Sequence, residues 1–414
     1  MPATQEPVIN APCRFRRGAQ PVGACYAPCE TGVNAGTAGR RDPAFSRFRD
    51  PRACLRAYPR NMTIEGPAAP VSARPVCVTG ASGFIATHIV RDLLARGYRV
   101  RGTIRNHRRK QDLAFLTSLP GASERLELVG ADLLDPRGWD AAVAGCECVM
   151  HTASPYQIDV EDPRRDLVEP AVRGTRHVLD ACRRGGVKRV VLTSSMAAVT
   201  DEPDSRHVLT EADWNTKSTL DRNPYYFSKT MAEREAWAIV EEEEAAFELV
   251  VINPYMVIGP SLSPGPNYST QIFVNLANGA YPAIPALTWG FVDVRDVAMA
   301  HVRAMETPSA SGRYLCAGEH QSLREIAGIM REAGVRGRIP RLGMDNAIGT
   351  AFLKLLSYSQ PRGLGSYLRS HLGRVPAYDT GKIRRELGLE FRPVRTSVLD
   401  TLEDLRRRGL IQTS

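Results

Sequence analysis

Residues 76–86 read VCVTGASGFIA, and this stretch decides the fold. An apolar run predicts a buried strand, and the residues after it predict a helix. Apolar side chains recur on one face of that helix at Ile85, Ile89 and Leu93. Gly80 permits a tight turn, Gly83 permits close approach of a pyrophosphate, and Ala86 keeps the helix near the strand. Because a helix N-terminus offers unpaired N–H groups, the stretch predicts a dinucleotide-binding turn, with Phe84 and Ile85 completing it.

Further short β-branched runs alternate with helical patterns along the chain. They lie at residues 100–104, 126–129, 148–150, 187–193 and 249–252. Nearly all-apolar strands separated by helices predict a doubly wound parallel α/β sheet of the Rossmann type. We therefore expect a Rossmann domain over residues 75–254. A smaller substrate-binding lobe, interleaved with it, is expected over residues 255–414.

Residues 1–74 differ in composition from the rest of the 414-residue chain. They hold ten prolines, six glycines, eleven arginines and five acidic residues, a net charge of +6 out of the total +9. Such a stretch buries too little apolar surface to fold, so we expect a disordered tail. The alternatives are an organellar import signal, favoured by Arg14, Arg16 and Arg17, or translation that starts at Met62.

Composition excludes several classes of function. The remaining +3 is too small to indicate a nucleic-acid-binding face, and the sequence has no apolar run of about 18 residues that would span a membrane. Nine scattered cysteines match no metal-site spacing and favour a reducing compartment, so we expect a cytoplasmic protein without a metal. The expected partner is a small molecule, bound by a monomer or homodimer, with neither nucleic acid nor membrane.

The end of the second predicted strand indicates which dinucleotide binds. An NAD enzyme carries an acidic residue there, whereas this chain has Arg105. A guanidinium can hold a 2′-phosphate in a bidentate manner, so we expect NADP(H). Arg109 is expected to assist, and Lys110 either assists or belongs to a solvated basic helix start.

Two more strand ends supply predicted cofactor contacts. Asp132 and Leu133 follow the third strand and are expected at the adenine. The fourth strand ends in small residues over which a cofactor can pass, namely Thr152, Ala153 and Ser154. His151 is expected to be a buried structural residue. Both assignments use the rule that open α/β sheets bind ligands at the carboxyl ends of their strands.

Three residues form the predicted catalytic set. Ser195 ends the fifth strand, and Tyr225 and Lys229 lie four residues apart in a helix that begins after Asn223. Residues four apart share one helical face, and a neighbouring ammonium lowers the pKa of a phenol. Tyr225 can then exchange protons near neutral pH, while Ser195 donates a hydrogen bond to the substrate oxygen. Tyr226 is expected to pack or to line the substrate pocket.

Several segments together resemble one protein family. They are VCVTGASGFIATHIVR (76–91), HTASP (151–155), VVLTSSMAAV (190–199), YYFSKTMAE (225–233), NPYMVIGP (253–260) and FVDVRDVAMAH (291–301). The chain resembles the extended short-chain dehydrogenase/reductases over residues 75–410. Within them it is similar to the branch of dihydroflavonol reductases, cinnamoyl-CoA reductases and methylglyoxal/isovaleraldehyde reductases.

The resemblance implies roles for further residues. Ser195, Tyr225 and Lys229 would be the catalytic triad, with Lys229 also holding the nicotinamide ribose. Pro254 and Val257, on the loop after the sixth predicted strand, would contact the nicotinamide. The motif around the tyrosine departs from that of cinnamoyl-CoA reductases, and Thr200 stands where dihydroflavonol reductases carry Asn or Asp. The implied enzyme is therefore a carbonyl reductase of broad or unknown substrate range.

The resulting hypothesis is an NADPH-dependent reductase of an aldehyde or ketone. Two alternatives remain open: a 3β-hydroxysteroid dehydrogenase or sugar-nucleotide epimerase/dehydratase, and a non-catalytic NADP(H) sensor. Asp296 is expected to cap the helix that follows the strand beginning at Phe291. By position alone, substrate contacts are expected from Tyr156, Met196, Tyr226, Met256 and Tyr268.

Overall fold

The computed structural model describes residues 73–105, 113–154, 160–242, 247–264 and 267–413. Nearly all of the predicted tail lies outside the described residues, and so do Arg109, Lys110 and Tyr156. The boundaries of the two predicted domains stay a prediction.

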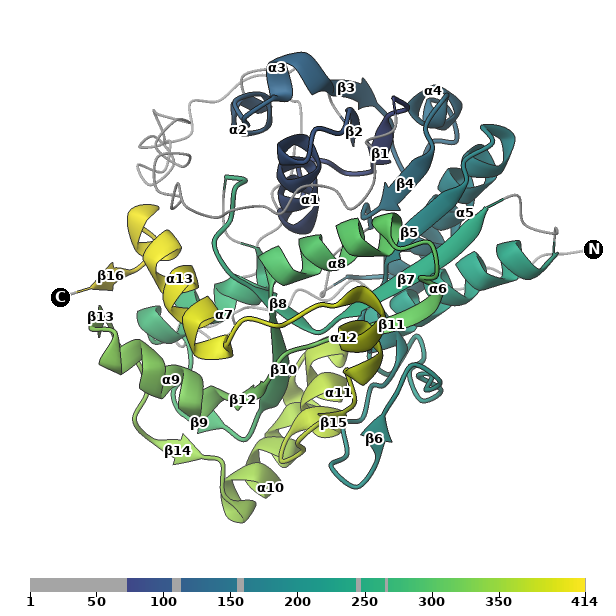
Figure 1. Ribbon diagram of the computed structural model, residues 1–414. Coiled ribbons are helices and arrows are strands. Elements are labelled where there is room, and N and C mark those ends of the chain that lie inside the picture. Colours follow the sequence, from purple (N-terminus) through teal and green to yellow (C-terminus); the bar gives the residue numbers. More distant parts are fainter. Residues whose placement is uncertain (1–72, 106–112, 155–159, 243–246, 265–266, 414) are drawn as a thin grey trace, which may run out of the picture. The chain divides into compact units, whose positions relative to one another are not determined.

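Seven parallel strands form the large sheet, in the order β11-β7-β5-β4-β1-β2-β3 (Figure 1). The strands are β1 (Val76–Val78), β2 (Val100–Ile104), β3 (Leu126–Gly130), β4 (Cys148–His151), β5 (Arg189–Thr193), β7 (Glu248–Pro254) and β11 (Gly312–Cys316). The order reverses between β1 and β4, where such sheets open a crevice at their carboxyl edge. The predicted doubly wound parallel sheet is confirmed.

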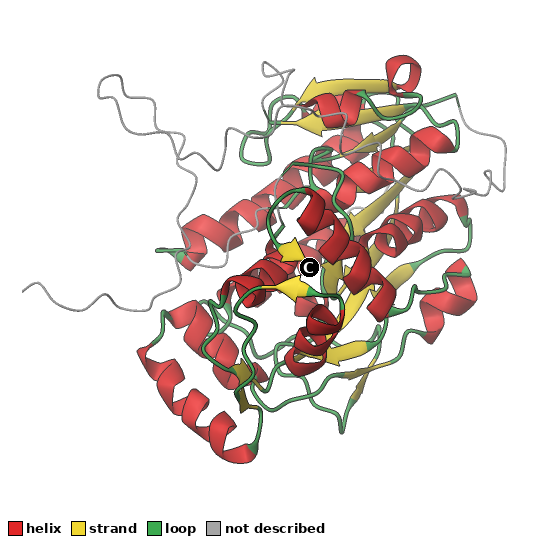
Figure 2. Cartoon of the chain, turned by 90° about the vertical axis from the view of Figure 1, so that its left-hand side faces the viewer, coloured by secondary structure: helices red, strands yellow, loops and turns green. Residues whose placement is uncertain are grey.

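Helices cover both faces of this sheet (Figure 2). Those packed on one face are α1 (Phe84–Ala95), α8 (Val294–Glu306) and α12 (Gly381–Leu387). Those on the other face are α4 (Trp139–Val143), α5 (Glu169–Arg184) and α6 (Pro224–Glu242). Strand β1 shows why both layers are needed: Val76 and Val78 pack toward α1 and α8, whereas Cys77 packs toward α4 and α5. Alternate residues of a strand point to opposite faces, so an all-apolar strand requires cover on both.

Most of the chain after Pro254 builds a second, smaller core. Its sheet consists of β8 (Met256–Ile258), β10 (Thr288–Asp293) and β12 (His320–Ser322), with β10 in the middle. The helices around it are α7 (Tyr268–Asn278), α9 (Leu323–Glu332) and α13 (Val394–Arg407). Strand β11 belongs to this part of the sequence and yet pairs with β7 at the edge of the large sheet.

The remaining elements are short. They are α2 (Ala114–Thr117), α3 (Ala122–Arg125), η3 (Arg164–Val168), η4 (Met196–Ala198), α10 (Ala347–Leu356), η5 (Ser357–Ser359) and α11 (Arg362–His371). Three strand pairs complete them: β6 (Val208–Leu209) with β15 (Ala377–Tyr378), β9 (Ile284–Pro285) with β14 (Gly343–Met344), and β13 (Val335–Arg336) with β16 (Gln412–Thr413).

The expected cap of α8 is wrong by three residues. Asp293, the last residue of β10, is the N-cap, and its side chain accepts a hydrogen bond from the backbone N–H of Arg295. Asp296 lies inside the helix, where it is 2 % exposed and pairs with Arg392. Both positions carry a carboxylate at the helix start, so sequence spacing alone favoured the wrong one.

Candidate active site

The turn after β1, predicted to bind a dinucleotide, packs closely on the ends of β2 and β4. Gly80 adopts φ +64°, and a Cβ on it would lie 3.1 Å from the Cβ of Ala153 at the end of β4. Its backbone N–H donates to Thr103 Oγ1 of β2 at 3.0 Å, and the N–H of Gly83 donates to its carbonyl oxygen at 2.8 Å. The N-cap of α1 is Gly83, which has no side chain to cap the helix. The first N–H groups of α1 therefore lack a capping side chain at Gly83, as a phosphate-binding helix start requires.

Thr79 joins this turn to the end of β4. Its hydroxyl oxygen accepts hydrogen bonds from the backbone N–H groups of Thr152 at 3.0 Å and Ala153 at 2.9 Å. The same hydroxyl lies 2.9 Å from Nδ1 of His151. Burial, and then the charge of Lys229, lower the pKa of His151 to about 3, so this imidazole is neutral and serves as a hydrogen-bonding core residue.

Lys229 connects the end of β4 to helix α6. Its Nζ donates a 2.8 Å hydrogen bond to Ser154 Oγ and lies 5.8 Å from the centre of the Tyr225 ring, one helical turn earlier. Burial lowers the pKa of Lys229 to about 8, because the charged form loses solvation. The ammonium therefore stays mostly protonated at neutral pH, next to the phenol that it is expected to activate.

Ser195 lies just beyond β5, in extended backbone at the start of η4. Its hydroxyl oxygen accepts a 3.1 Å hydrogen bond from the backbone N–H of Ala197. Its carbonyl oxygen accepts a 3.2 Å hydrogen bond from Asn253 Nδ2 of β7. Helix α6 packs against η4, so Ser195 belongs to the same end of the sheet as Tyr225 and Lys229.

Glu233, a buried carboxylate one turn beyond Lys229, was not among the residues predicted from the sequence. It is 1 % exposed, and its Oε2 accepts hydrogen bonds from Ser194 Oγ at 2.5 Å and Asn253 Nδ2 at 2.8 Å. Its Oε1 pairs with Nε of Arg313 on β11 at 2.6 Å. Glu233 thus ties α6 to β5, β7 and β11, and through Asn253 to the carbonyl group of Ser195. Its four-residue spacing from Lys229 was the available signal.

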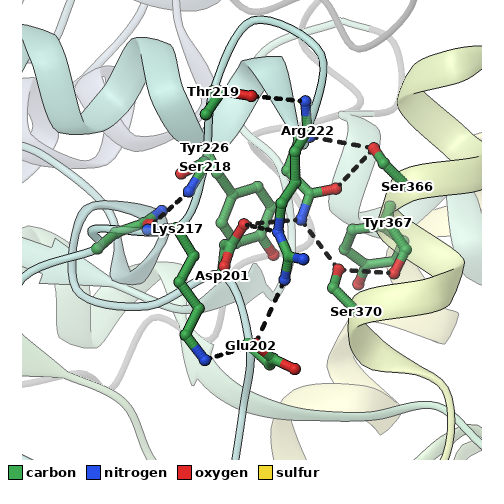
Figure 3. Close-up of polar contacts among 12 residues, drawn as sticks. Asp201, Glu202, Lys217, Ser218, Thr219, Arg222, Tyr226, Ser366, Tyr367 and Ser370 are labelled. Atoms are coloured by element: carbon green, nitrogen blue, oxygen red, sulfur yellow. Dashed lines mark hydrogen bonds and ion pairs between the residues drawn. The ribbon is translucent and has the colours of Figure 1, made fainter.

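Helix α11 holds the first turn of α6, which the sequence analysis also missed. Asn223 adopts φ +49° just before the helix. Its backbone N–H donates to Ser366 Oγ at 3.0 Å, and its Nδ2 donates to Ser370 Oγ at 2.9 Å. Figure 3 shows Ser366 and Ser370 of α11 pointing toward the segment that carries Arg222. These hydrogen bonds to α11 of the smaller core therefore fix the residue at which α6 begins.

The predicted adenosine contacts lie apart from this cluster. Arg105 is exposed at the end of β2, beside the end of β3, and Arg109 is outside the described residues. The carboxylate of Asp132 accepts from the backbone N–H of Leu134 at 3.0 Å. Leu133 packs on α5, where a Cβ on Gly174 would lie 3.0 Å from its Cβ. Their roles toward a cofactor stay predictions.

Two predicted nicotinamide contacts lie in strands, not in a loop. Pro254 is the last residue of β7 and Val257 the middle residue of β8, so only Tyr255 separates the strands. Val257 is 8 % exposed and pairs with Val292 of β10. The prediction that both residues belong to a loop is therefore wrong, although both remain near the carboxyl end of β7.

The positions expected to contact substrate differ in exposure. Met196 is 1 % exposed in a small apolar cluster, and Met256 is partly buried. The hydroxyl of Tyr226 lies 3.1 Å from Nε2 of His371 in α11. Tyr268, the first residue of α7, is 43 % exposed. Tyr226 therefore adds a hydrogen bond between α6 and α11.

Within the described residues, no cluster of His, Cys, Asp or Glu side chains is arranged to hold a metal ion. In the same part of the chain, no helix is long and apolar enough to cross a membrane.

Comparison with known proteins places the chain among enzymes of one family. The profile of the NAD dependent epimerase/dehydratase family matches residues 76–317. Cinnamoyl-CoA reductase CAD2 of Medicago truncatula is 40 % identical over 343 residues, which cover 80 % of this chain and 96 % of the relative. Tetraketide alpha-pyrone reductase 1 of Arabidopsis thaliana is 35 % identical, with 82 % of this chain and 97 % of the relative covered.

Solved structures agree with the sequence comparison. Yeast methylglyoxal/isovaleraldehyde reductase Gre2, complexed with NADPH, is 30 % identical with a TM-score of 0.67 and covers 81 % of this chain and all of its own. Vestitone reductase from alfalfa is 28 % identical with a TM-score of 0.61 and covers 81 % of this chain and 99 % of its own. The chain therefore belongs to the NAD dependent epimerase/dehydratase family, as the motifs predicted.

Proposed function

We propose that this protein is an NADPH-dependent reductase that converts an aldehyde or ketone to the alcohol. The proposal depends most on the position of the Lys229 ammonium, which is buried between the end of β4 and Tyr225. The similarity to the Medicago truncatula cinnamoyl-CoA reductase and to yeast Gre2 with NADPH supports the same reaction class. The proposed substrate is a carbonyl compound that binds beside Tyr225 at the carboxyl edge of the large sheet.

The residues around the crevice fit a bound dinucleotide. Gly80 lets the turn pack closely on Ala153 at the end of β4, and the N-terminus of α1, which begins after Gly83, suits the pyrophosphate. Arg105 would meet the 2′-phosphate, while Thr152, Ala153 and Ser154 would lie under the cofactor. When bound, NADPH supplies the hydride for the carbonyl carbon.

The side chains of α6 and η4 supply the proton and the charge stabilisation. Tyr225 donates its phenolic proton to the carbonyl oxygen as negative charge develops there. Ser195 donates a hydrogen bond to the same oxygen, and the Lys229 ammonium stabilises the phenolate that remains. A proton from solvent then restores Tyr225, and the products are an alcohol and NADP⁺.

Arg105 provides the test of cofactor choice. Replacing it with alanine removes a charged hydrogen bond to the 2′-phosphate, so the preference for NADPH over NADH should fall about ten- to a hundredfold. The measurement is kcat/KM with each cofactor. Arg99→Ala, an exposed arginine just before β2, is the matched control and should leave the preference unchanged. A preference that Arg105→Ala does not alter would show that another group selects the cofactor.

A panel of aldehydes and ketones, followed by NADPH absorbance, tests the reaction itself. We expect consumption of NADPH with one NADP⁺ released for each alcohol formed. An epimerase or dehydratase would recycle its cofactor and release none. Tight NADPH binding without turnover of any carbonyl compound would instead favour a sensor.

We further infer that the protein works in a reducing compartment such as the cytoplasm, because the five described cysteines are free thiols.

A further inference from the structure

Helix α10 presents a continuous apolar face to solvent. Ile348 is 84 % exposed, Phe352 49 %, Leu355 70 % and Leu356 44 %. Their spacing of three and four residues places these side chains on one side of the helix. In Figure 1, α10 lies at the lower edge, beyond β14 and away from the large sheet. We call these four residues, together with Tyr358 of η5, the α10 face.

The opposite side of α10 packs against β14 and the second core. Gly349 is buried, and a Cβ on it would lie 2.6 Å from the carbonyl oxygen of Met344 in β14. Asn346 caps the helix by accepting a 2.7 Å hydrogen bond from the Gly349 N–H. Leu353 packs against the second core. The exposed side chains therefore belong to a fixed helix, and contiguous apolar surface of this kind marks an interaction site.

The stretch of chain that carries the α10 face is rich in cations. From Asn346 to Tyr378 the sequence holds four Lys or Arg residues and no Asp or Glu. Arg369 stacks its guanidinium 4.5 Å from the centre of the Tyr358 ring, at the edge of the face. Arg362 is 92 % exposed and forms a 3.8 Å ion pair with Asp221, itself 88 % exposed. Such a pair contributes little, so the charge of Arg362 remains available.

We propose that the α10 face docks on an anionic lipid surface. Aliphatic and aromatic side chains flanked by cations match the boundary between acyl chains and anionic headgroups. The contact is peripheral, because the helix has ten residues and exposes one apolar side, while Leu353 on its other side packs against the second core. The sequence-based expectation of no membrane partner rested on the lack of a spanning segment, which does not bear on a surface contact.

Charge argues against the other occupants. A two-fold dimer would set this face against its own copy and bring cations together without acidic partners. Residues 1–74 of this chain carry a net charge of +6 and so do not complement the face either. Nucleic acid offers negative charge, but its phosphates and bases do not bind a row of exposed aliphatic side chains.

The test is co-sedimentation of the full chain with vesicles, either of phosphatidylcholine alone or of phosphatidylcholine mixed with phosphatidylserine. The protein should sediment with the mixed vesicles and stay in solution with the neutral ones. Leu355→Glu should weaken binding at least about tenfold, because it removes an apolar contact and adds a negative charge. Arg362→Glu should weaken it about fivefold or more.

Leu399→Glu is the matched control, because Leu399 is also a leucine on a helix and is 38 % exposed on α13. It should bind vesicles like the parent chain. Ile348→Glu serves as a second variant if Leu355→Glu does not fold. Absence of binding to mixed vesicles, or binding that the α10 variants do not weaken, would overturn the proposal. So would light scattering that shows a dimer which Leu355→Glu dissociates, since a second copy would then cover the face.

Discussion

The two ends of helix α6 are held in different ways. From Lys229 onward the helix is bound to the large sheet, through Ser154 for Lys229 and through Ser194 and Asn253 for Glu233. Its first turn is bound instead to α11 of the second core, through Asn223. Tyr225 lies between these two sets of contacts. We infer that the contacts with the sheet hold Lys229 beside Tyr225 for proton transfer. The contacts with the second core are expected to position the carbonyl substrate relative to Tyr225.

The strongest test of the sheet side is Lys229→Met, which should lower turnover about a thousandfold by removing the charge beside Tyr225. The variant should also unfold at a higher temperature. The pKa of Lys229 is about 8 in the fold against 10.5 for an ordinary lysine, so its charge destabilises the fold by about 3 kcal/mol at neutral pH.

The sign of this linkage can be checked by pH. Between pH 8 and 10.5 the unfolded chain binds more protons at Lys229 than the folded chain does, so stability from this residue rises with pH. Because buried cysteines and tyrosines have raised pKa values and oppose this rise, the test is the difference in the free energy of unfolding between the parent chain and Lys229→Met, which should shrink as pH rises from 8 to 10.5. Lys188→Met, at an exposed lysine before β5, is the control. A Lys229→Met protein that turns over normally, or that unfolds earlier, would contradict the account.

Glu233→Gln tests how the sheet holds the helix. An amide keeps the shape but presents one acceptor where the carboxylate presents two, and it leaves the charge of Arg313 buried. We expect a loss of about 3 kcal/mol in the free energy of unfolding, measured by urea titration. Glu235→Gln, on the same helix, breaks a partly exposed pair with Arg176 and should cost less than about 1 kcal/mol. Equal losses in the two variants would show that the Glu233 network does not anchor α6.

Ser370→Ala tests the other end of α6 and should have the smallest effect. It removes one acceptor for Asn223, at a cost of about 1 kcal/mol. The KM for the carbonyl substrate should rise several-fold while the KM for NADPH stays unchanged, which steady-state kinetics can separate. Ser359→Ala, at an exposed serine of η5, should alter neither. A rise in the KM for NADPH alone would contradict the proposal that the first turn of α6 governs binding of the carbonyl substrate.

The features of the large sheet and of helix α6 that were predicted from the sequence are local ones. The turn at Gly80 follows its own strand directly, and the start of α6 after Asn223 is marked by proline at position 224. The parallel, doubly wound character of the sheet followed from the alternation of apolar strands and helices, whereas the order of the strands was not predicted. These features depend on residues within a few positions of one another, so periodicity and spacing were enough.

The contacts that were missed join distant parts of the chain. Glu233 meets Arg313 eighty residues later, and Asn223 meets Ser366 across 143 residues. On the sequence, a glutamate in a helix looks like a solvated residue, and serines in α11 carry no signal of their own. Only the fold brings them together, because β11 returns to the large sheet and α11 returns to the start of α6.

The most direct test of the account is the Tyr225→Phe variant, measured both for turnover of a carbonyl substrate with NADPH and for NADPH binding by fluorescence. The account predicts that turnover disappears while NADPH binding stays within about twofold of the parent chain, because only the transferred proton is removed. Tyr226→Phe, whose hydroxyl contacts His371, should keep most of the turnover. Undiminished turnover by Tyr225→Phe would contradict the account.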